Sequence, residues 1–318
     1  MKVGLYSITY LGLWYGGRAL TIDEVIQRAR EYGYEGIEID GKRPHGNPAD
    51  LTRARCEELR QKARAAGVEI YAVAANNDFS SPIPEHRESQ LLYLRELVRM
   101  TADLGARVLR VFAAWPGVTC TEEGGTYALA RRLWRDAHQG VSAEQTWAWC
   151  CDGLREAARW AGDAGVTLAL QNHPPVTNSP ADMLHMIDDV ASPHVKACLD
   201  APLAAKQGIT SMQQAARDVG ARQVLSHFGG EYERAADGSI RGLVRNPDET
   251  LTLENYYLDF AMGMQQIEYE GYIGYELCHA LPKIDGRTVG LDFADENARL
   301  AAEYMRTILK RVPQTQIA

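Results

Sequence analysis

The sequence predicts an α/β fold in which eight parallel strands close into a (β/α)8 TIM barrel, and three observations lead to this prediction. Eight short segments are apolar or rich in β-branched residues and are bounded by Gly, Pro, Asn or Asp, as buried strands are. Eight longer segments carry apolar residues at helical spacing and alternate with the strands. Four helices end in a glycine step that leads directly into a strand, which is typical of the αβ links of a barrel. We therefore expect one barrel domain over residues 1–318.

The predicted strands run from KVGLYSI near the amino terminus to YIGYEL near the carboxyl terminus. The glycine step precedes the strands in the segments GYEGIEI, GVEIYAV, GARVLRV and GVTLALQ. In chain order the strands are predicted at residues 2–8, 35–40, 68–75, 107–114, 166–172, 195–200, 223–228 and 272–277.

The predicted helices show start and stop signals as well as periodicity. The first helix begins with Thr21 and Glu24, a capping-box pair, and ends at Gly33. The third helix carries leucines at helical spacing and ends at Gly105. In chain order the helices are predicted at residues 21–32, 52–66, 85–104, 142–164, 180–190, 211–219, 253–270 and 294–311.

An open, doubly wound sheet is the alternative architecture, but no GxGxxG motif follows the first strand, so its usual phosphate site is missing. Two segments, at about 116–141 and 229–252, are longer than barrel loops need to be. Both follow a predicted strand. We therefore expect them at the carboxyl-terminal face of the barrel, as lids or partner surfaces.

The composition excludes several classes of protein. Hydrophobic residues make up 46% and charged residues 24%, with a net charge of −8, so no nucleic-acid footprint of clustered Lys and Arg is expected. No apolar run is long enough for a membrane span, and the amino terminus is too polar for a signal peptide. The six cysteines form no CxxC pair, which favours reduced thiols. We expect a cytoplasmic protein that binds neither nucleic acid nor membrane.

The last four predicted strands end in residues that can bind a metal or move a proton. Side chains at the carboxyl ends of barrel strands converge on one mouth, and residues two apart on a strand share a face. A carboxylate, an amide oxygen, an imidazole and a second carboxylate form a mixed O/N site suited to Mn²⁺, Mg²⁺ or Co²⁺. The residues at these strand ends are Gln171, His173, Asp200, His227, Glu276 and His279.

The segments LALQNH, CLDAP, LSHF and GYEL resemble the xylose-isomerase-like superfamily of sugar (phosphate) isomerases and epimerases. The resemblance covers nearly the whole chain. It implies a barrel that binds a small sugar substrate and one divalent cation, for which Mn²⁺ is the first choice. The superfamily takes its metal ligands from strands five to eight as Glu, Asp, His and Glu. Carried over, these positions are Gln171, Asp200, His227 and Glu276. The first of the four departs from the pattern, because it is an amide.

This departure bears on the mechanism that the resemblance implies. In the ketose epimerase branch, the glutamates of strands five and eight work from opposite faces of the substrate. An amide cannot accept a proton at neutral pH, so a symmetric two-carboxylate epimerisation is in question here. Glu276 or His173 would then move the proton, although His173 is equally explained as a packed residue. One negative charge fewer should also weaken divalent binding and make the bound cation a stronger Lewis acid.

The sequence also resembles a second branch of the superfamily, the metal-dependent subunits of C-glycoside deglycosidases and related 3-oxo-glycoside-cleaving enzymes. Their lyase chemistry needs one base and a metal. Trp115, Trp134 and Tyr232 in the long loops would form a pocket for an aromatic aglycone, or else a subunit interface. This branch implies a glycoside substrate and a small partner subunit. A homo-oligomer is expected by analogy with other barrels.

Three further residues are candidates for substrate binding. Arg110 points into the barrel if the strand alternates, but a core ion pair explains it equally well. His279 contacts either the substrate or only its own loop. His45 follows the second strand at the correct end of the barrel. We expect a metal-dependent sugar isomerase or epimerase that abstracts a proton α to a carbonyl. The alternatives are a glycoside lyase and a non-catalytic sugar-binding barrel.

Overall fold

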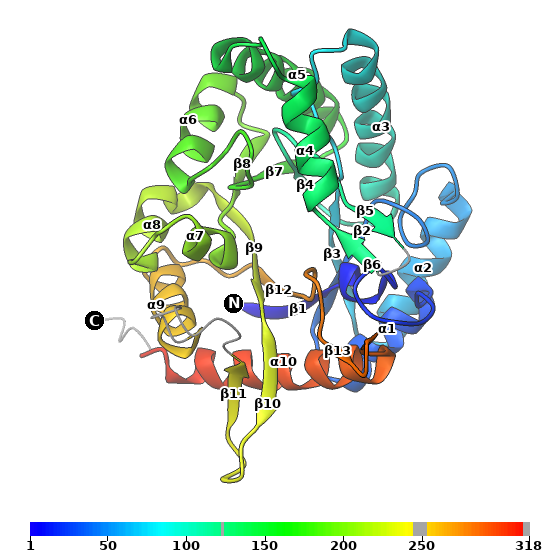
Figure 1. The fold of residues 1–318 in the computed structure, drawn as a ribbon, viewed down its shortest axis with the longest axis vertical. Helices are drawn as coiled ribbons and strands as arrows, with labels where there is room; N and C mark the ends of the chain where they lie inside the picture. The colour runs from blue at the N-terminus through cyan, green and yellow to red at the C-terminus, as the bar shows by residue number, and fades with distance from the viewer. Residues whose placement is uncertain (122–123, 244–252, 314–318) are drawn as a thin grey trace.

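The computed structural model describes residues 1–121, 124–243 and 253–313, and in it eight parallel strands close into a barrel (Figure 1). The order around the barrel is β1-β12-β9-β8-β7-β4-β3-β2, with Lys2 of β1 opposite Tyr272 of β12 where the barrel closes. The strands are β1 Lys2–Tyr6, β2 Gly36–Asp40, β3 Glu69–Ala74, β4 Val108–Val111, β7 Thr167–Gln171, β8 Val195–Cys198, β9 Gln223–Gly229 and β12 Tyr272–Glu276. The predicted (β/α)8 barrel and its eight strands are confirmed.

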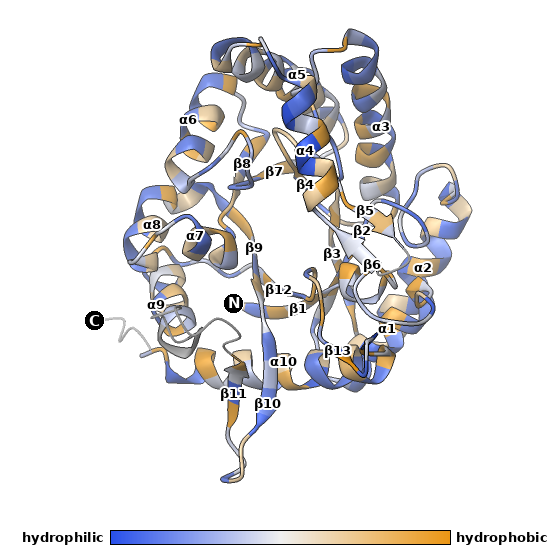
Figure 2. Ribbon diagram, in the orientation of Figure 1, coloured by the Kyte–Doolittle hydropathy of each residue, from blue (hydrophilic) through white to orange (hydrophobic). Residues whose placement is uncertain are grey.

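The helices that join these strands form the outer ring in Figure 1. They are α1 Ile22–Glu31, α2 Arg53–Ala65, α3 Pro84–Asp103, α5 Ala143–Asp163, α6 Pro180–Val190, α8 Met212–Val219, α9 Leu253–Gln266 and α10 Leu291–Arg311. The capping box at α1 is present, since Thr21 accepts from the Glu24 backbone and the Glu24 carboxylate accepts from the Thr21 backbone. Hydrophobic and hydrophilic residues alternate around these helices, as amphipathic helices on a barrel require (Figure 2).

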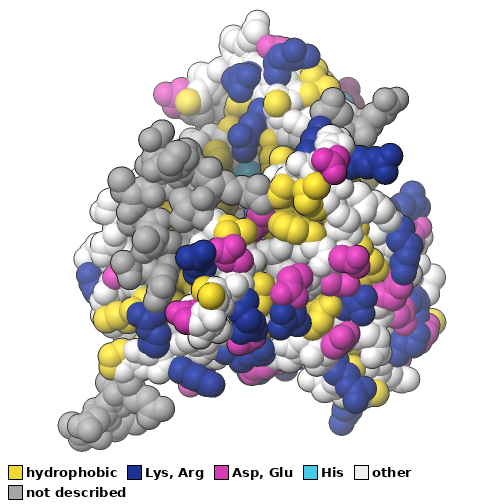
Figure 3. Space-filling model, turned by 60° about the horizontal axis from the view of Figure 1, so that its bottom comes forward, with side chains coloured by type: hydrophobic (Ala, Val, Ile, Leu, Met, Phe, Trp, Pro, Cys, Tyr) yellow, Lys and Arg dark blue, Asp and Glu magenta, His cyan; other side chains and the backbone are white. Residues whose placement is uncertain are grey.

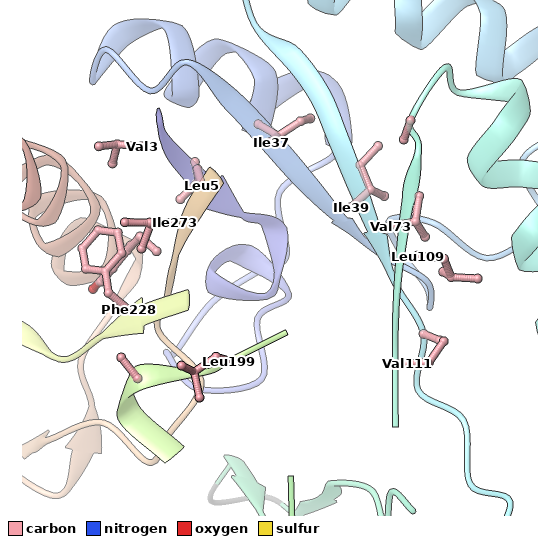
Figure 4. Packing of buried hydrophobic residues seen from close by; sticks show 14 of the residues in the cluster. Val3, Leu5, Ile37, Ile39, Val73, Leu109, Val111, Leu199, Phe228 and Ile273 are labelled. Carbon is pink, nitrogen blue, oxygen red and sulfur yellow. The ribbon is translucent and has the colours of Figure 1, made fainter. Parts of the chain in front are cut away.

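The main core lies between the strands and the helices. Ile37 and Ile39 of β2 are fully buried in it, beside Leu5 of the neighbouring strand (Figure 4). Because successive strand residues point to opposite faces, Glu38 between the two isoleucines points into the barrel. The barrel interior therefore receives a carboxylate in the middle of a strand.

Tyr71 of β3 fills the barrel interior toward its amino-terminal end. Its ring stacks on the ring of Tyr272 with the centroids 4.0 Å apart. Two glycines make room for it, because a Cβ added at Gly4 would lie 2.5 Å from the Tyr71 ring and one at Gly274 would lie 2.6 Å from its hydroxyl. The Tyr71 ring is thus the floor beneath the functional end of the barrel.

The two long segments contain elements that the sequence did not predict. Residues 116–141 hold the hairpin β5 Thr119–Thr121 and β6 Gly124–Thr126, followed by α4 Ala128–Ala137. Residues 229–252 hold the hairpin β10 Glu231–Arg234 and β11 Ile240–Leu243, and their last part, 244–252, lies outside the described residues. The shorter additions are η1 Ser7–Tyr10, α7 Ala201–Lys206, η2 Gly220–Arg222 and the pair β13 Lys283–Ile284 and β14 Arg287–Thr288.

The surface and the cysteines agree with the composition. Lys and Arg side chains lie among Asp and Glu side chains over the face in Figure 3, with neither sign collected into one stripe. All six cysteines are free. Within the described ranges, every helix is too short or too polar to cross a lipid bilayer.

Candidate active site

A cavity of about 830 Å³ opens at the carboxyl-terminal end of the barrel. Its polar part is formed by strand-end residues, among them Tyr6, Gln171 and Glu276. Residues of the segment after β4, including Trp115 and Tyr127, form an aromatic wall. A cavity of this size with few polar groups is typical of a small-molecule site.

Asp200, His227 and Glu276 form the one group of described acidic, histidine and cysteine side chains that could hold a metal ion. Each offers one ligand atom, and these atoms lie within 4.8 Å of one another. Asp200 is positioned by local structure, because it is the N-cap of α7 and its Oδ1 accepts from the Leu203 amide at 2.8 Å. The three predicted ligands from β8, β9 and β12 are therefore brought together.

The imidazole of His227 is held between two carboxylates. Its Nδ1 lies 3.3 Å from Asp200 Oδ2, and its Nε2 lies 2.8 Å from Glu38 Oε2. A carboxylate behind a histidine is the usual way to orient a metal-binding imidazole. Burial alone would lower the pKa of His227, but the charge of Glu38 and the hydrogen bond to Asp200 raise it well above its ordinary value. Nδ1 is the ring nitrogen on the side of Asp200, and it is the atom that would bind a metal.

The carboxyl group of Glu276 completes the cluster at the end of β12. Burial raises its pKa, and the nearby Asp200 carboxylate raises it further. Two carboxylates held this close favour a divalent cation, because it would neutralise their mutual repulsion. The donor set of two carboxylates and one imidazole also suits such a cation. The residues present therefore fit a divalent metal.

Gln171 lies beside the cluster but presents its amide nitrogen to it. Gln171 Oε1 accepts from Arg110 Nη1 at 2.7 Å, while Gln171 Nε2 donates to Asp200 Oδ2 at 2.7 Å. Turning the amide over would place two donors against each other at Arg110. In this arrangement the Gln171 oxygen faces Arg110 and its amide nitrogen faces Asp200, and ligation of a metal by Gln171 stays a prediction.

Arg110 itself is fixed by three partners in the barrel interior. Besides Gln171, its Nε donates to Glu38 Oε1 at 3.1 Å and its Nη2 donates to the Tyr6 hydroxyl at 2.7 Å. Tyr6 in turn donates to Asp40 Oδ2 at 2.6 Å. Arg110 is only 3% exposed yet lines the cavity, so both expectations for it, inward direction and a core ion pair, hold together.

A family model described as the xylose isomerase-like TIM barrel matches residues 26–308. The chain belongs to this family. The resemblance seen in the strand-end motifs is thereby confirmed for the superfamily. Among curated protein sequences, none matches the chain.

Solved structures with the same barrel include several sugar epimerases. A D-psicose 3-epimerase studied with D-fructose has 19% identity, a TM-score of 0.70, and covers 97% of this chain and 99% of its own. The D-psicose 3-epimerase of Clostridium cellulolyticum H10 has 17% identity, a TM-score of 0.71 and the same coverage. A 3-keto-D-glucoside 4-epimerase from E. coli has 19% identity, a TM-score of 0.66, and covers 96% of this chain and 99% of its own. At these identities the likeness is one of fold.

In this xylose isomerase-like barrel, His173 lines the cavity from the β7 side. Its Nδ1 lies 2.5 Å from the Pro174 carbonyl oxygen, and its ring meets Phe112 and Trp115 edge-on at 4.8 and 4.9 Å between centroids. Burial lowers the pKa of His173 to about 4, so the ring is neutral at pH 7. A base of this strength is poorly matched to neutral pH, whereas burial shifts the pKa of Glu276 upward from its ordinary value.

The other candidate residues divide between the cavity and the core. Trp115 and His279 line the cavity, and His279 Nε2 lies 3.1 Å from Glu231 Oε1. His45 is outside it, since Nδ1 lies 3.0 Å from Ser7 Oγ and Nε2 lies 2.8 Å from the Leu20 carbonyl oxygen. We do not carry His45 into the proposed site.

The two remaining aromatic candidates also lie outside the cavity lining. Trp134 donates through Nε1 to Ser80 Oγ at 2.9 Å. Tyr232 is buried and donates its hydroxyl to the Gly229 carbonyl oxygen at 2.9 Å. Of the three aromatic residues expected around an aglycone, the structure therefore brings only Trp115 to the cavity.

Sequence reasoning missed three residues that shape the site, namely Glu38, Tyr6 and Tyr127. Glu38 carried a signal, because a carboxylate between two isoleucines in a barrel strand must point inward. Tyr6 carried a weaker one, as the last residue of β1. Tyr127 carried none, because its place depends on how the segment after β4 folds back over the barrel.

Proposed function

We propose that this xylose isomerase-like barrel is a divalent-cation-dependent enzyme that removes the proton next to the carbonyl of a keto sugar, as sugar isomerases and epimerases do. The observation that carries the proposal is the cluster of Asp200, His227 and Glu276 at the ends of adjacent strands, which meets a cavity of about 830 Å³ through Glu276. Both features lie at the end of the barrel where such enzymes act.

Asp200, His227 and Glu276 would hold the cation, with Mn²⁺ as the first choice and Mg²⁺ or Co²⁺ as alternatives. When bound, a divalent cation polarises a carbonyl and stabilises negative charge on its oxygen. The His227–Glu38 contact supports this assignment, since it leaves Nδ1 on the side of the cluster.

The chain's own residues would take complementary roles around the sugar. Glu276 would remove the proton, because its carboxyl group lines the cavity and burial raises its pKa toward neutrality. Neutral His173 would accept a hydrogen bond from a sugar hydroxyl through Nε2. Trp115 would pack against the apolar face of the ring, and His279 would contact an outer hydroxyl.

The similar structures suggest the substrate class. Two of them are D-psicose 3-epimerases and one is a 3-keto-D-glucoside 4-epimerase. Each of these names contains a sugar with a carbonyl or a keto group, so a keto sugar is the substrate that we propose for this chain.

A second function, cleavage of 3-oxo-glycosides, is favoured by the shape of the cavity. Its volume is within the range of about 300–1,000 Å³ that holds drug-sized ligands, so it has room for a sugar with an attached group. The stacked pair Phe112 and Trp115, with centroids 4.8 Å apart, forms a flat apolar wall for that group. A glycoside-cleaving enzyme should lose much of its selectivity for glycosides over free ketoses in Trp115→Ala. An isomerase should keep its selectivity in that variant.

Proton exchange in D₂O tests the proposal. The Mg²⁺-loaded full-length protein is incubated with D-fructose and with methyl 3-oxo-β-D-glucopyranoside, and deuterium beside the carbonyl is followed by NMR. We expect uptake that disappears in Asp200→Asn and persists in the control Asp188→Asn, an exposed residue of α6. Sugar binding without exchange would instead support a non-catalytic sugar-binding barrel.

The cytoplasmic location, the homo-oligomer and a partner subunit stay predictions.

A further inference from the structure

Residues 171 and 276 lie on opposite sides of the candidate cation site. In the barrel order, β7 and β12 flank β8 and β9, which carry Asp200 and His227 at or just beyond their ends. A substrate in the cavity beside this site would therefore have Gln171 at the end of β7 on one side and Glu276 at the end of β12 on the other. What each side can do to a proton depends on the groups at these two ends.

The β12 side carries a carboxyl group, whereas the β7 side carries the fixed donors Arg110 and Gln171 and the neutral ring of His173. Glu276 offers a carboxyl group to the cavity. On the other side, Gln171 is an amide and Arg110 is a guanidinium that stays protonated in proteins, so neither can take up a proton. The Arg110–Gln171 bond of 2.7 Å holds these two groups together.

Arg110 keeps donors available for a ligand. Its guanidinium has five N–H groups, and three of them are used by Glu38, Gln171 and Tyr6. Because Arg110 lines the cavity, the remaining two can donate to an oxygen of a bound sugar. A preorganised cation at this place stabilises negative charge that develops on that oxygen.

We propose that the Arg110–Gln171 pair takes the place of a second base, so that the protein exchanges the substrate proton on one face only. The inference rests on the proposed function. In the step, the proton on the carbon beside the carbonyl moves to Glu276, and the C–H electron pair moves toward the carbonyl oxygen to form an enediolate. The Arg110 N–H groups donate to an oxygen of this enediolate. The same carboxyl group returns the proton to that carbon or to its neighbour, from the same face.

The consequence is stereochemical. Return to the same carbon gives exchange with retained configuration. Return to the neighbouring carbon, with the hydroxyl proton passing to the former carbonyl oxygen, gives an isomer with a shifted carbonyl. Inversion at the exchanged carbon needs an acid or base on the opposite face. Arg110 and Gln171 cannot serve as one, and the neutral His173 ring is the other group on that side, with its Nδ1 engaged by the Pro174 carbonyl oxygen. The chain would thus exchange or isomerise a ketose without epimerising it.

The experiment follows configuration as well as deuterium. Full-length Mg²⁺-loaded protein is incubated in D₂O with D-fructose and with methyl 3-oxo-β-D-glucopyranoside, and the sugars are separated and read by NMR. We expect deuterium in sugars of the starting configuration, with the epimer forming about 100-fold more slowly, since a positioned acid or base contributes at least about that factor. Epimer formation as fast as deuterium entry would overturn the inference while leaving the proposed function intact. No deuterium in either sugar would overturn both.

Three variants locate the cause. Gln171→Glu supplies a carboxylate on the β7 side and should let the epimer appear, whereas the matched Gln171→Leu should not. His173→Gln tests the other proton acceptor on that side, the His173 ring. If the native protein inverts its substrate and His173→Gln exchanges without inversion, His173 is a second base and the inference is wrong.

Discussion

The Glu38→Gln substitution should weaken cation binding through the tautomer of His227. Glu38 accepts from Arg110 Nε at 3.1 Å through one oxygen and contacts His227 Nε2 at 2.8 Å through the other. A glutamine must keep its oxygen toward Arg110, which can only donate, so its NH₂ group would face His227 Nε2. A neutral ring that accepts through Nε2 carries its proton on Nδ1, the nitrogen that faces Asp200. A protonated Nδ1 cannot bind a metal.

The expected loss is about 10- to 100-fold in Mg²⁺ or Mn²⁺ affinity, the usual effect of changing a group behind a metal ligand. This corresponds to about 1.4–2.7 kcal/mol of binding free energy. Isothermal titration calorimetry measures it, with Glu31→Gln, an exposed residue of α1, as the control. Circular dichroism of each variant checks that the barrel is folded. Unchanged affinity in a folded Glu38→Gln protein would show that His227 Nδ1 is not a ligand.

Three further predictions concern proton uptake and packing. Because Glu38 and Asp200 raise the pKa of His227, metal binding should displace a proton from this ring, and the metal affinity should rise with pH. Calorimetry in buffers of different ionisation enthalpy would show no difference if this is wrong. Burial lowers the pKa of His45, so the unfolded chain binds the proton first as the pH falls. The contribution of His45 to the free energy of unfolding should be fully present above about pH 6.5 and should decrease below it. Urea titrations should therefore give a flatter dependence of the unfolding free energy on pH for His45→Gln. Gly274→Ala should cost about 1–3 kcal/mol of stability, and Tyr71→Phe should recover part of that cost, because the added methyl first meets the Tyr71 hydroxyl at 2.6 Å. An undiminished cost in the double variant would contradict this explanation.

Periodicity and chain breakers were sufficient to predict the barrel, because each strand and helix is coded locally. Gly33 and Gly105, for example, both have positive φ and end helices where the sequence indicated. The convergence of Asp200, His227 and Glu276 also followed from the fold, since strand ends of a barrel must meet. Local pattern and barrel geometry together account for this part of the site.

The direction of the Gln171 amide did not follow from the sequence. It depends on Arg110, which lies 61 residues away along the chain and donates hydrogen bonds to three partners in the barrel interior. The role of His173 was open for a similar reason, because its environment of Phe112 and Trp115 is assembled only by the fold. Such tertiary contacts, and not local propensity, decide the chemistry of a side chain at a strand end.

The Tyr71 ring makes the barrel a tube that is closed at one end. A second cavity of about 620 Å³ lies at the amino-terminal end, bordered by Tyr272 and Lys2, and it shares no lining residue with the upper cavity. With the stacked Tyr71 and Tyr272 rings filling the barrel interior, we expect a ligand to enter and leave the upper cavity through the same opening. Reactant and product would use the same opening and the same cavity, so one must leave before the other can bind. A released product should therefore act as a competitive inhibitor of its own formation.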